Sequence, residues 1–147
     1  MIRVATVDDI PRLVELGRML HSTSRYASHS YDDGAVASFM EQQIDGAGVI
    51  FVAERDGVVI GTLLGGITEQ WFSADLLAFE YAFFVEPSAR HGITSARLLK
   101  AFTTWAELRG AKHVQIGLTT DLCVEGTSRF YRSHGFEDAG LFFEKAL

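Results

Sequence analysis

The chain has few of the features that would place it among secreted, extended or nucleic-acid-binding proteins. Cys123 is the only cysteine in 147 residues, so an internal disulfide framework is excluded. The sequence contains no linker, repeat or low-complexity segment. Lys and Arg number 13 against 19 Asp and Glu, a net charge of −6, and no basic run is present. This charge balance argues against a nucleic-acid partner.

Long apolar runs are also missing. The longest uncharged apolar stretch, residues 58–68, is too short to span a bilayer, and the first nine residues lack the apolar region of a signal peptide. We therefore expect a cytoplasmic protein without a membrane partner. A length of 147 residues and a hydrophobic content of 48% fit one domain over residues 1–147.

Hydrophobic patterning predicts strands and helices along the whole chain. The predicted strands are 2–5, 49–54, 58–67, 76–85, 113–118 and 141–145. Four helices are predicted. The first begins at Asp8, and the second begins at Asp32 or Asp33 and ends near Gly46. The other two cover 93–109 and 126–133. Asp56-Gly57 is typical of a tight hairpin turn. Strand, helix and strand between residues 76 and 118 form a βαβ crossover, which makes those two strands parallel.

Two short segments are the most informative about the chemistry of the protein. Residues 84–99 read as a strand end, a polar turn with Pro87 and Gly92, and the opening of an amphipathic helix. A helix N-terminus reached through such a turn offers free backbone N–H groups to an anion. The second segment, Phe130 to Phe136, closes the next helix and contains Tyr131 and Gly135.

These segments, their spacing and the order of elements resemble the GNAT superfamily of acyl-CoA-dependent N-acyltransferases over essentially the whole chain. The resemblance implies an α/β domain, α+β in some schemes. Its mixed, mostly antiparallel sheet has helices on both faces and one parallel βαβ pair that splays to hold CoA. It also implies transfer of an acetyl group from acetyl-CoA to a primary amine of a small molecule or peptide, by direct attack in a ternary complex. The alternative is a non-catalytic module of the same fold that binds CoA or a protein.

The family's cofactor turn has the pattern R-x-x-G-x-G/A. Arg90 matches its arginine, whereas Ile93 and Ser95 stand at the two glycine positions. Ile93 is the larger departure, because a β-branched side chain stands where phosphate approaches the backbone, and it either borders the cradle or packs into the core. Gly92 offers a shifted turn. The resemblance assigns cofactor contacts to Phe83, Phe84, Val85, Arg90, His91, Gly92, Ile93, Thr94 and Ser95. An exposed loop histidine is the alternative for His91.

Two residues are candidates for proton transfer. Tyr131 matches the tyrosine of the family pattern F-Y-x-x-x-G-F, which commonly protonates the leaving CoA thiolate; the alternative is a packed ring with a satisfied hydroxyl. Val124 stands where many relatives carry an asparagine. Glu80 is the lone acid within residues 76–85, and burial there would raise its pKa and make it a general base. A solvent-facing or Arg-paired glutamate is the alternative.

The remaining candidates concern the acceptor and metals. The family fold would place two loops around the acceptor cleft, and their aromatic residues are either substrate contacts or surface packing: Tyr26, Tyr31, Trp71 and Phe72. No His, Cys, Asp or Glu cluster has metal-ligand spacing, so we expect no metal. Cys123 lacks a recognisable catalytic partner and is interpreted as a packing residue.

The apolar and aromatic content predicts a homodimer. Eleven Phe, four Tyr and two Trp are many for 147 residues. Leu141, Phe142 and Phe143 concentrate part of this surplus near the C-terminus.

Overall fold

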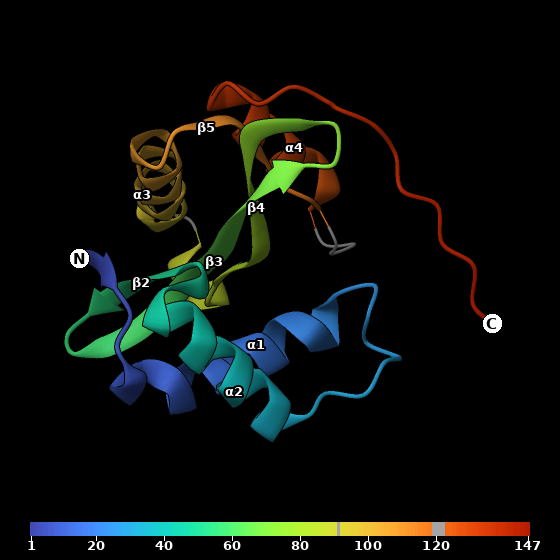
Figure 1. Cartoon of the computed structure of the whole chain (residues 1–147). Coiled ribbons are helices and arrows are strands. Elements are labelled where there is room, and N and C mark those ends of the chain that lie inside the picture. The colour runs from blue at the N-terminus through green and yellow to red at the C-terminus, as the bar shows by residue number, and fades with distance from the viewer. Residues whose placement is uncertain (91, 119–122) are drawn as a thin grey trace.

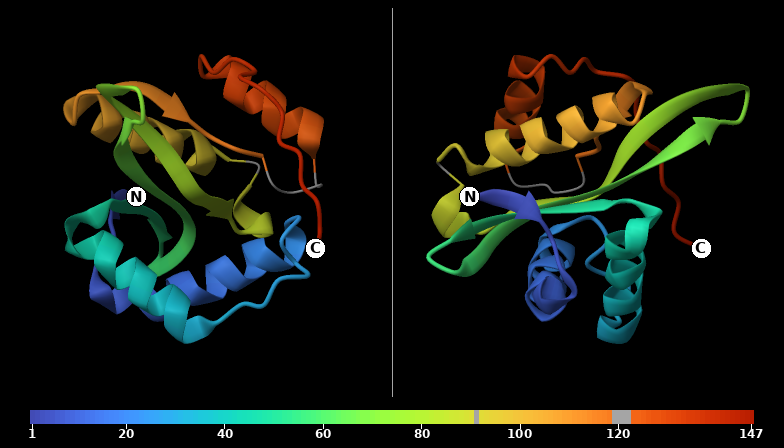
Figure 2. Two further views of the ribbon diagram at one scale, coloured as in Figure 1. Left: turned by 45° about the vertical axis from the view of Figure 1, so that its right-hand side comes forward. Right: turned by 60° about the vertical axis from the view of Figure 1, so that its left-hand side comes forward.

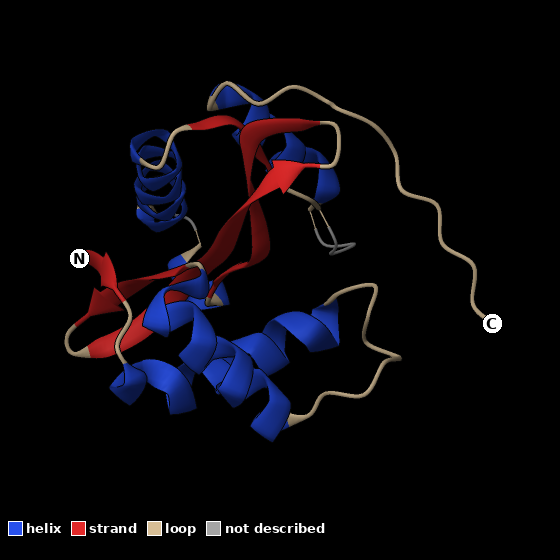
Figure 3. Ribbon diagram, in the orientation of Figure 1, coloured by secondary structure: helices blue, strands red, loops and turns tan. Residues whose placement is uncertain are grey.

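The fold consists of a sheet with helices on both faces (Figure 1, Figure 3). The computed structural model describes residues 1–90, 92–118 and 123–147. The strands are β1 (Ile2–Val4), β2 (Val49–Arg55), β3 (Val58–Gln70), β4 (Ser73–Val85) and β5 (Ala111–Gln115). The helices are α1 (Ile10–Thr23), α2 (Asp33–Gln42), α3 (Thr94–Leu108) and α4 (Val124–Ser133). Within these described ranges, no helix is both long and apolar enough to cross a membrane.

The strands lie in the order β1-β2-β3-β4-β5. All neighbouring pairs are antiparallel except β4 and β5, which are parallel and joined through α3. The predicted mixed sheet with one parallel pair is therefore confirmed. The predicted turn between β2 and β3 is confirmed as well, because Asp56 and Gly57 have φ angles of 52° and 77°. Positive φ at both positions is what the right-handed twist of a two-residue hairpin requires.

The helices form two layers on opposite faces of the sheet (Figure 2), and each layer covers an apolar core. On one face α3 and α4 cover the first core; its α3 members include Leu98, Leu99 and Phe102. On the other face α1 and α2 cover the second core, with Leu13, Leu16 and Met40. Full burial stabilises each such side chain by about 1.5–3 kcal/mol, so the two helix layers hold the sheet from both sides.

The prediction that Asp8 begins the first helix is wrong. The carboxylate of Asp9 accepts the Thr6 N–H at 2.8 Å and both terminal nitrogens of Arg3, at 2.8 and 2.9 Å. Asp8 is exposed. Arg3 on β1 therefore selects which aspartate holds this turn. For α2 the prediction allowed two residues, and Asp32 is the cap, since its side chain accepts the Ala35 N–H at 2.9 Å.

The predicted strand 141–145 is also wrong. Residues 137–147 have no regular structure and extend outside the helix layers as a tail (Figure 1), in which Glu144 forms an ion pair of 3.1 Å with Arg25. Leu141, Phe142 and Phe143 are 84%, 89% and 91% exposed. A strand pattern becomes a strand only where a neighbouring edge supplies hydrogen bonds, and this segment lies on none.

Candidate active site

The parallel strands β4 and β5 separate at a fork. They pair from Leu76↔Ala111 to Phe79↔Gln115, after which β4 continues to Val85 without β5 and remains paired with β3. The strand predicted to reach Leu118 thus ends at Gln115, which is also the last residue of β5 that pairs with β4. A bulge lies at the same place, because Leu64 faces Ala82 and Gly65 faces Glu80, which leaves Tyr81 without a partner on β3. Bulges bend a strand, which helps to open the wedge between β4 and β5.

Glu80 occupies this fork. Its Oε1 accepts the backbone N–H of Gly117 at 3.0 Å, just past the end of β5. Burial raises the pKa of Glu80, and the bond from Gly117 opposes the rise in part. Among the described residues, no arginine or lysine forms an ion pair with it. The carboxyl is therefore poised to take up and release a proton nearer neutral pH than an exposed glutamate would.

Tyr131 reaches the same fork from α4. Its half-buried ring lies 5.6 Å from the ring of Phe130 and 5.8 Å from that of Phe136, centroid to centroid, and all three pack on the α3 side of the sheet. Burial raises the pKa of the Tyr131 phenol, and the nearby charge of Glu80 raises it further. The phenol therefore stays protonated across the physiological range and is able to donate. The two candidate proton-transfer groups thus lie near enough for the charge of Glu80 to act on the phenol of Tyr131.

Beyond the fork, β4 has an open edge. The N–H of Glu86 bonds to the Ile60 carbonyl of β3 at 2.8 Å. Because antiparallel strands alternate, the main-chain groups of Phe83 and Val85 point away from β3, into the wedge, whereas those of Phe84 point toward it. The Val85 carbonyl accepts Nε of Arg90 at 2.7 Å. The N–H and C=O of Phe83 and the N–H of Val85 are thus positioned to bind an extended chain as an added strand.

The N-terminus of α3 lies at the end of the turn that follows β4. Its first intrahelical bond runs from Arg97 N–H to the Ile93 carbonyl at 3.0 Å, and none of the described side chains caps it. The N–H groups of Thr94, Ser95 and Ala96 consequently have no intrahelical acceptor. This contrasts with α2, which Asp32 caps. An uncapped N-terminus with a favourable helix dipole suits a phosphate.

Comparison with known proteins identifies the family of the chain. The model of the acetyltransferase (GNAT) family matches residues 16–136. The chain belongs to the GNAT acetyltransferase family. The GNAT fold that its sequence predicts is therefore confirmed.

Solved structures agree on the fold. An aminoglycoside acetyltransferase from an uncultured soil metagenomic sample, in complex with sisomicin, has a TM-score of 0.77 at 20% identity, covering 100% of this chain and 95% of that one. The aminoglycoside N-acetyltransferase AAC(6')-Iy in complex with CoA has a TM-score of 0.78 at 21% identity, with the same coverage of each chain. An acetyltransferase of Trypanosoma brucei has a TM-score of 0.76 at 16% identity, covering 100% and 99%. A search of curated sequences finds no match.

Most of the turn that resembles the GNAT cofactor loop is described; His91 lies outside the described residues. Arg90 is folded back, with its guanidinium 5.1 Å from the centre of the Phe84 ring as well as bonded to Val85. It thereby anchors the turn to the end of β4. Gly92 is exposed, and a Cβ there would lie 3.9 Å from its nearest neighbour, the Ala89 carbonyl. This position therefore accepts a side chain.

Ile93 does not pack into the core. Its side chain is 59% exposed, and its φ of −87° is one that any L-residue adopts. The alternative of Ile93 as a core residue is thus wrong. The GNAT turn forms here without a glycine at this position, and the isoleucine borders the α3 N-terminus instead of filling the protein.

We expect Ile93→Gly to leave the free energy of unfolding nearly unchanged, because glycine is an acceptable N-cap and little buried surface is lost. Affinity for CoA should stay the same or tighten by up to about tenfold, equivalent to roughly 1.4 kcal/mol. Urea unfolding and calorimetric titration with CoA measure the two effects. A loss of about 2 kcal/mol or more in stability together with weaker binding would contradict this placement.

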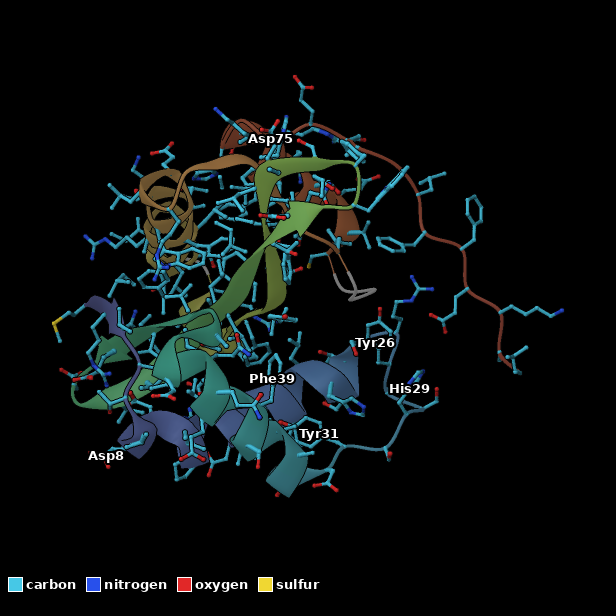
Figure 4. All side chains as sticks on the ribbon, viewed as in Figure 1. Asp8, Tyr26, His29, Tyr31, Phe39 and Asp75 are labelled. Carbon is cyan, nitrogen blue, oxygen red and sulfur yellow. The ribbon has the colours of Figure 1, made fainter. Side chains whose placement is uncertain are left out.

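The aromatic residues expected around the acceptor do not gather in one place. Tyr31 lies against α1 (Figure 4), where its hydroxyl donates to the Val14 carbonyl at 2.8 Å. A Cβ at Gly17 would lie 2.5 Å from that hydroxyl, so the glycine makes room for it. Tyr31 therefore holds the α1–α2 loop in place. Tyr26 is 42% exposed on that loop and lies edge-on to His29 at 5.5 Å (Figure 4).

Trp71 and Phe72 lie at the tip of the β3–β4 hairpin, which projects beyond both helix layers (Figure 2). They are 95% and 67% exposed, with ring centres 5.3 Å apart. At about 3.3 Å per residue, the strand from Phe72 to Glu80 spans roughly 25 Å. The structure does not bring this pair to the fork.

Residues at the start of α4 differ from expectation. Cys123 is exposed and has a φ of 54°, so its interpretation as a packing residue is wrong. Val124 begins α4 and is 44% exposed. In the described part of the chain, no group of three or more His, Cys, Asp and Glu side chains is arranged to hold a metal. Gly117 is the site residue that sequence reasoning missed, since a backbone N–H donor leaves no signal in side-chain patterns.

Proposed function

We propose that this GNAT protein transfers the acetyl group of acetyl-CoA to a primary amine by direct attack in a ternary complex. The observation that carries the proposal is the meeting of Glu80 and Tyr131 at the fork between β4 and β5. Burial raises the pKa of both groups, which suits Glu80 to accept a proton and Tyr131 to donate one. Acyl transfer to an ammonium acceptor needs both capacities.

The surroundings of the fork support a CoA-shaped ligand. The pantetheine arm would bond to the main chain of Phe83 and Val85 on the open edge of β4. The pyrophosphate would lie at the uncapped N-terminus of α3, against the N–H groups of Thr94 to Ala96. The thioester would then face the pair at the fork. The same layout accounts for the turn formed by Arg90 and the residues that follow it.

Proton transfer follows from the two environments. Glu80, its pKa raised by burial, takes the proton of the incoming ammonium, directly or through water. The amine nitrogen forms the new C–N bond, the C–S bond breaks, and Tyr131 protonates the departing sulfur. The nitrogen gives up its second proton, through water, to the Tyr131 phenolate, and Glu80 releases its proton to solvent, so the cycle balances. Cys123 is exposed and plays no part in this scheme.

The acceptor class remains primary amines. The solved structures similar in fold include aminoglycoside acetyltransferases, one of them in complex with sisomicin. Aminoglycosides therefore belong in an acceptor screen beside polyamines, amino acids and peptide N-termini. The net charge of −6 is compatible with any of these cations.

Acetyl-CoA is expected to stabilise the folded protein. A ligand that binds only the folded state, at 100 times its Kd, adds about 2.7 kcal/mol, which raises the Tm of a domain this size by roughly 5–10 °C. Dephospho-CoA and pantetheine should shift the Tm less, because they lose anion contacts. Thermal shift and titration calorimetry measure both. No shift and no binding heat with millimolar CoA would contradict the proposed function and also its alternative, a CoA-binding module.

A non-catalytic CoA-binding module is favoured by Ile93, Ser95 and Val124, which depart from the family pattern. Release of free thiol from acetyl-CoA, measured across the amine screen, separates the two functions. Turnover above the rate without protein supports the transferase. Tight CoA binding without turnover on any amine supports the module.

A further inference from the structure

A polar clamp joins helix α1 to the beginning of the turn between β4 and α3. At its centre is Arg12 of α1, whose three guanidinium nitrogens all have acceptors. One terminal nitrogen pairs with Glu86, the first residue after β4, and the other pairs with Glu15 at 2.8 Å. Nε donates to the Val59 carbonyl of β3 at 3.0 Å. Because the guanidinium is planar and its acceptors come from α1, β3 and the turn, its orientation is fixed.

The pair between Arg12 and Glu86 is shielded from water. Their side chains are 26% and 22% exposed, whereas those of the surface pair Arg18 and Asp33 are 55% and 60% exposed. An exposed pair contributes little, because water and salt screen it. A half-buried pair resists separation, since removal of one member leaves the other poorly solvated. Arg12 and Glu86 therefore hold their two segments in a defined position.

Glu86 fixes the start of the turn. Its N–H donates to the Ile60 carbonyl of β3 at 2.8 Å, and its own carbonyl accepts the N–H of Ala89 at 2.9 Å. It directly follows Val85, whose N–H is one of the groups positioned to bind an extended chain at the open edge of β4. Near α3 the turn has less support from side chains, because Ile93 is exposed. The position of Glu86 therefore matters for both ends of the turn.

We propose that Arg12 is a positioning residue for CoA binding. Through Glu86 it sets the turn so that the main chain of Val85 and the N-terminus of α3 face one extended ligand together. Arg90 joins the turn only to β4, the strand that precedes it. Arg12 adds a tie to α1, which lies on the other face of the sheet from α3 (Figure 2). Arg12 thereby serves the CoA binding of the proposed function, on which this role rests.

Hydrogen exchange of the ligand-free protein tests the clamp itself. In Arg12→Met the amides of Glu86 and Ala89 should exchange about tenfold faster, because the turn loses its tie to α1. Amides in the second half of α3 should exchange as in the unmodified protein, since Phe102 still packs in the core. Unchanged exchange at Glu86 and Ala89, or equally faster exchange throughout the chain, would overturn the proposal.

Titration calorimetry and steady-state kinetics test the consequence for binding. Arg12→Met should weaken CoA binding by about tenfold and raise the KM for acetyl-CoA by about the same factor. Its kcat should change by less than about threefold, because Glu80 and Tyr131 are untouched. Arg12→Lys should recover part of the affinity. A lysine keeps the charge opposite Glu86 but cannot bind all three acceptors of the guanidinium at once.

Arg3→Met is the matched control. The side chain of Arg3 is 31% exposed and pairs with Asp9 and Glu54, neither of which lies in the turn. This variant should lose stability and bind CoA normally. Glu86→Leu and the double variant Arg12→Met/Glu86→Leu should both bind CoA as weakly as Arg12→Met, because all three break the same contact.

The outcomes distinguish the role of Arg12 from the proposed function. Absence of CoA binding by the unmodified protein would overturn both. Three results would overturn only the role of Arg12: normal binding by Arg12→Met, equally weakened binding by Arg3→Met, or additive losses in the double variant. If Arg12→Met does not fold, Glu86→Gln replaces it, since the amide keeps the shape of the side chain without its charge. It should weaken CoA binding by about threefold, and normal binding would likewise overturn the role.

Discussion

Tyr131→Phe is expected to lower kcat by about 10²–10³-fold, the usual scale for one positioned acid. The substitution keeps the ring that packs beside Phe130 and Phe136 and removes only the hydroxyl. A thiolate leaves slowly without a proton but does leave, so activity falls without vanishing. Affinity for acetyl-CoA should change little, because the phenol acts after binding.

Steady-state kinetics and CoA titration measure the effect on the best amine from the screen. Tyr81→Phe is the matched control, because Tyr81 packs edge-on to Phe39 of α2 and is 50% exposed. It should keep near-normal kcat. If Tyr131→Phe retains full activity, the acid is water or another group, and the assignment of Tyr131 is wrong.

Glu80→Gln is expected to reduce activity by roughly 10²-fold at pH 6–7 and much less at high pH. The amide cannot take a proton from an ammonium, so the variant reacts only with amine that is already unprotonated. The unprotonated fraction increases as the pH rises. In the unmodified protein the rate should rise as the pH increases through the raised pKa of Glu80. The pH profile of the variant should lack this rise. Kinetics from pH 5 to 10 on one amine measure both profiles.

Stability gives a second, independent readout of Glu80. A carboxyl whose pKa is raised on folding stabilises the native state below its unfolded pKa, and this contribution is lost as pH rises through the folded pKa. Glu80→Gln should therefore be more stable than the unmodified protein at pH 7–8, and close to it at low pH. Glu69→Gln, at an exposed position of β3, should show neither effect. Equal pH profiles of kcat for Glu80→Gln and the unmodified protein would remove Glu80 as the base.

Local sequence signals were sufficient for most elements. The apolar period that stops at Gly110 predicted 93–109 for a helix observed at Thr94–Leu108, and Asp56-Gly57 predicted the hairpin turn that forms. The parallel pairing of β4 and β5 followed from the crossover rule alone. These signals are helix periodicity, left-handed turns and the length of a connection. They can be read from the sequence because each depends on residues that are close in the chain. The Phe-Tyr segment at residues 130–136 likewise located Tyr131.

The environment of each site residue depended instead on contacts between distant segments. Glu80 lies in the fork because β5 leaves β4 after Gln115, and its hydrogen-bond donor is the main chain of Gly117. Asp9 rather than Asp8 holds the first turn because Arg3 on β1 reaches it. Ile93 is exposed although its side chain is apolar. The segment 141–145 has the composition of a strand but pairs with no strand among the described residues. Burial, charge partners and strand edges are properties of packed surfaces, so only the tertiary structure decided them.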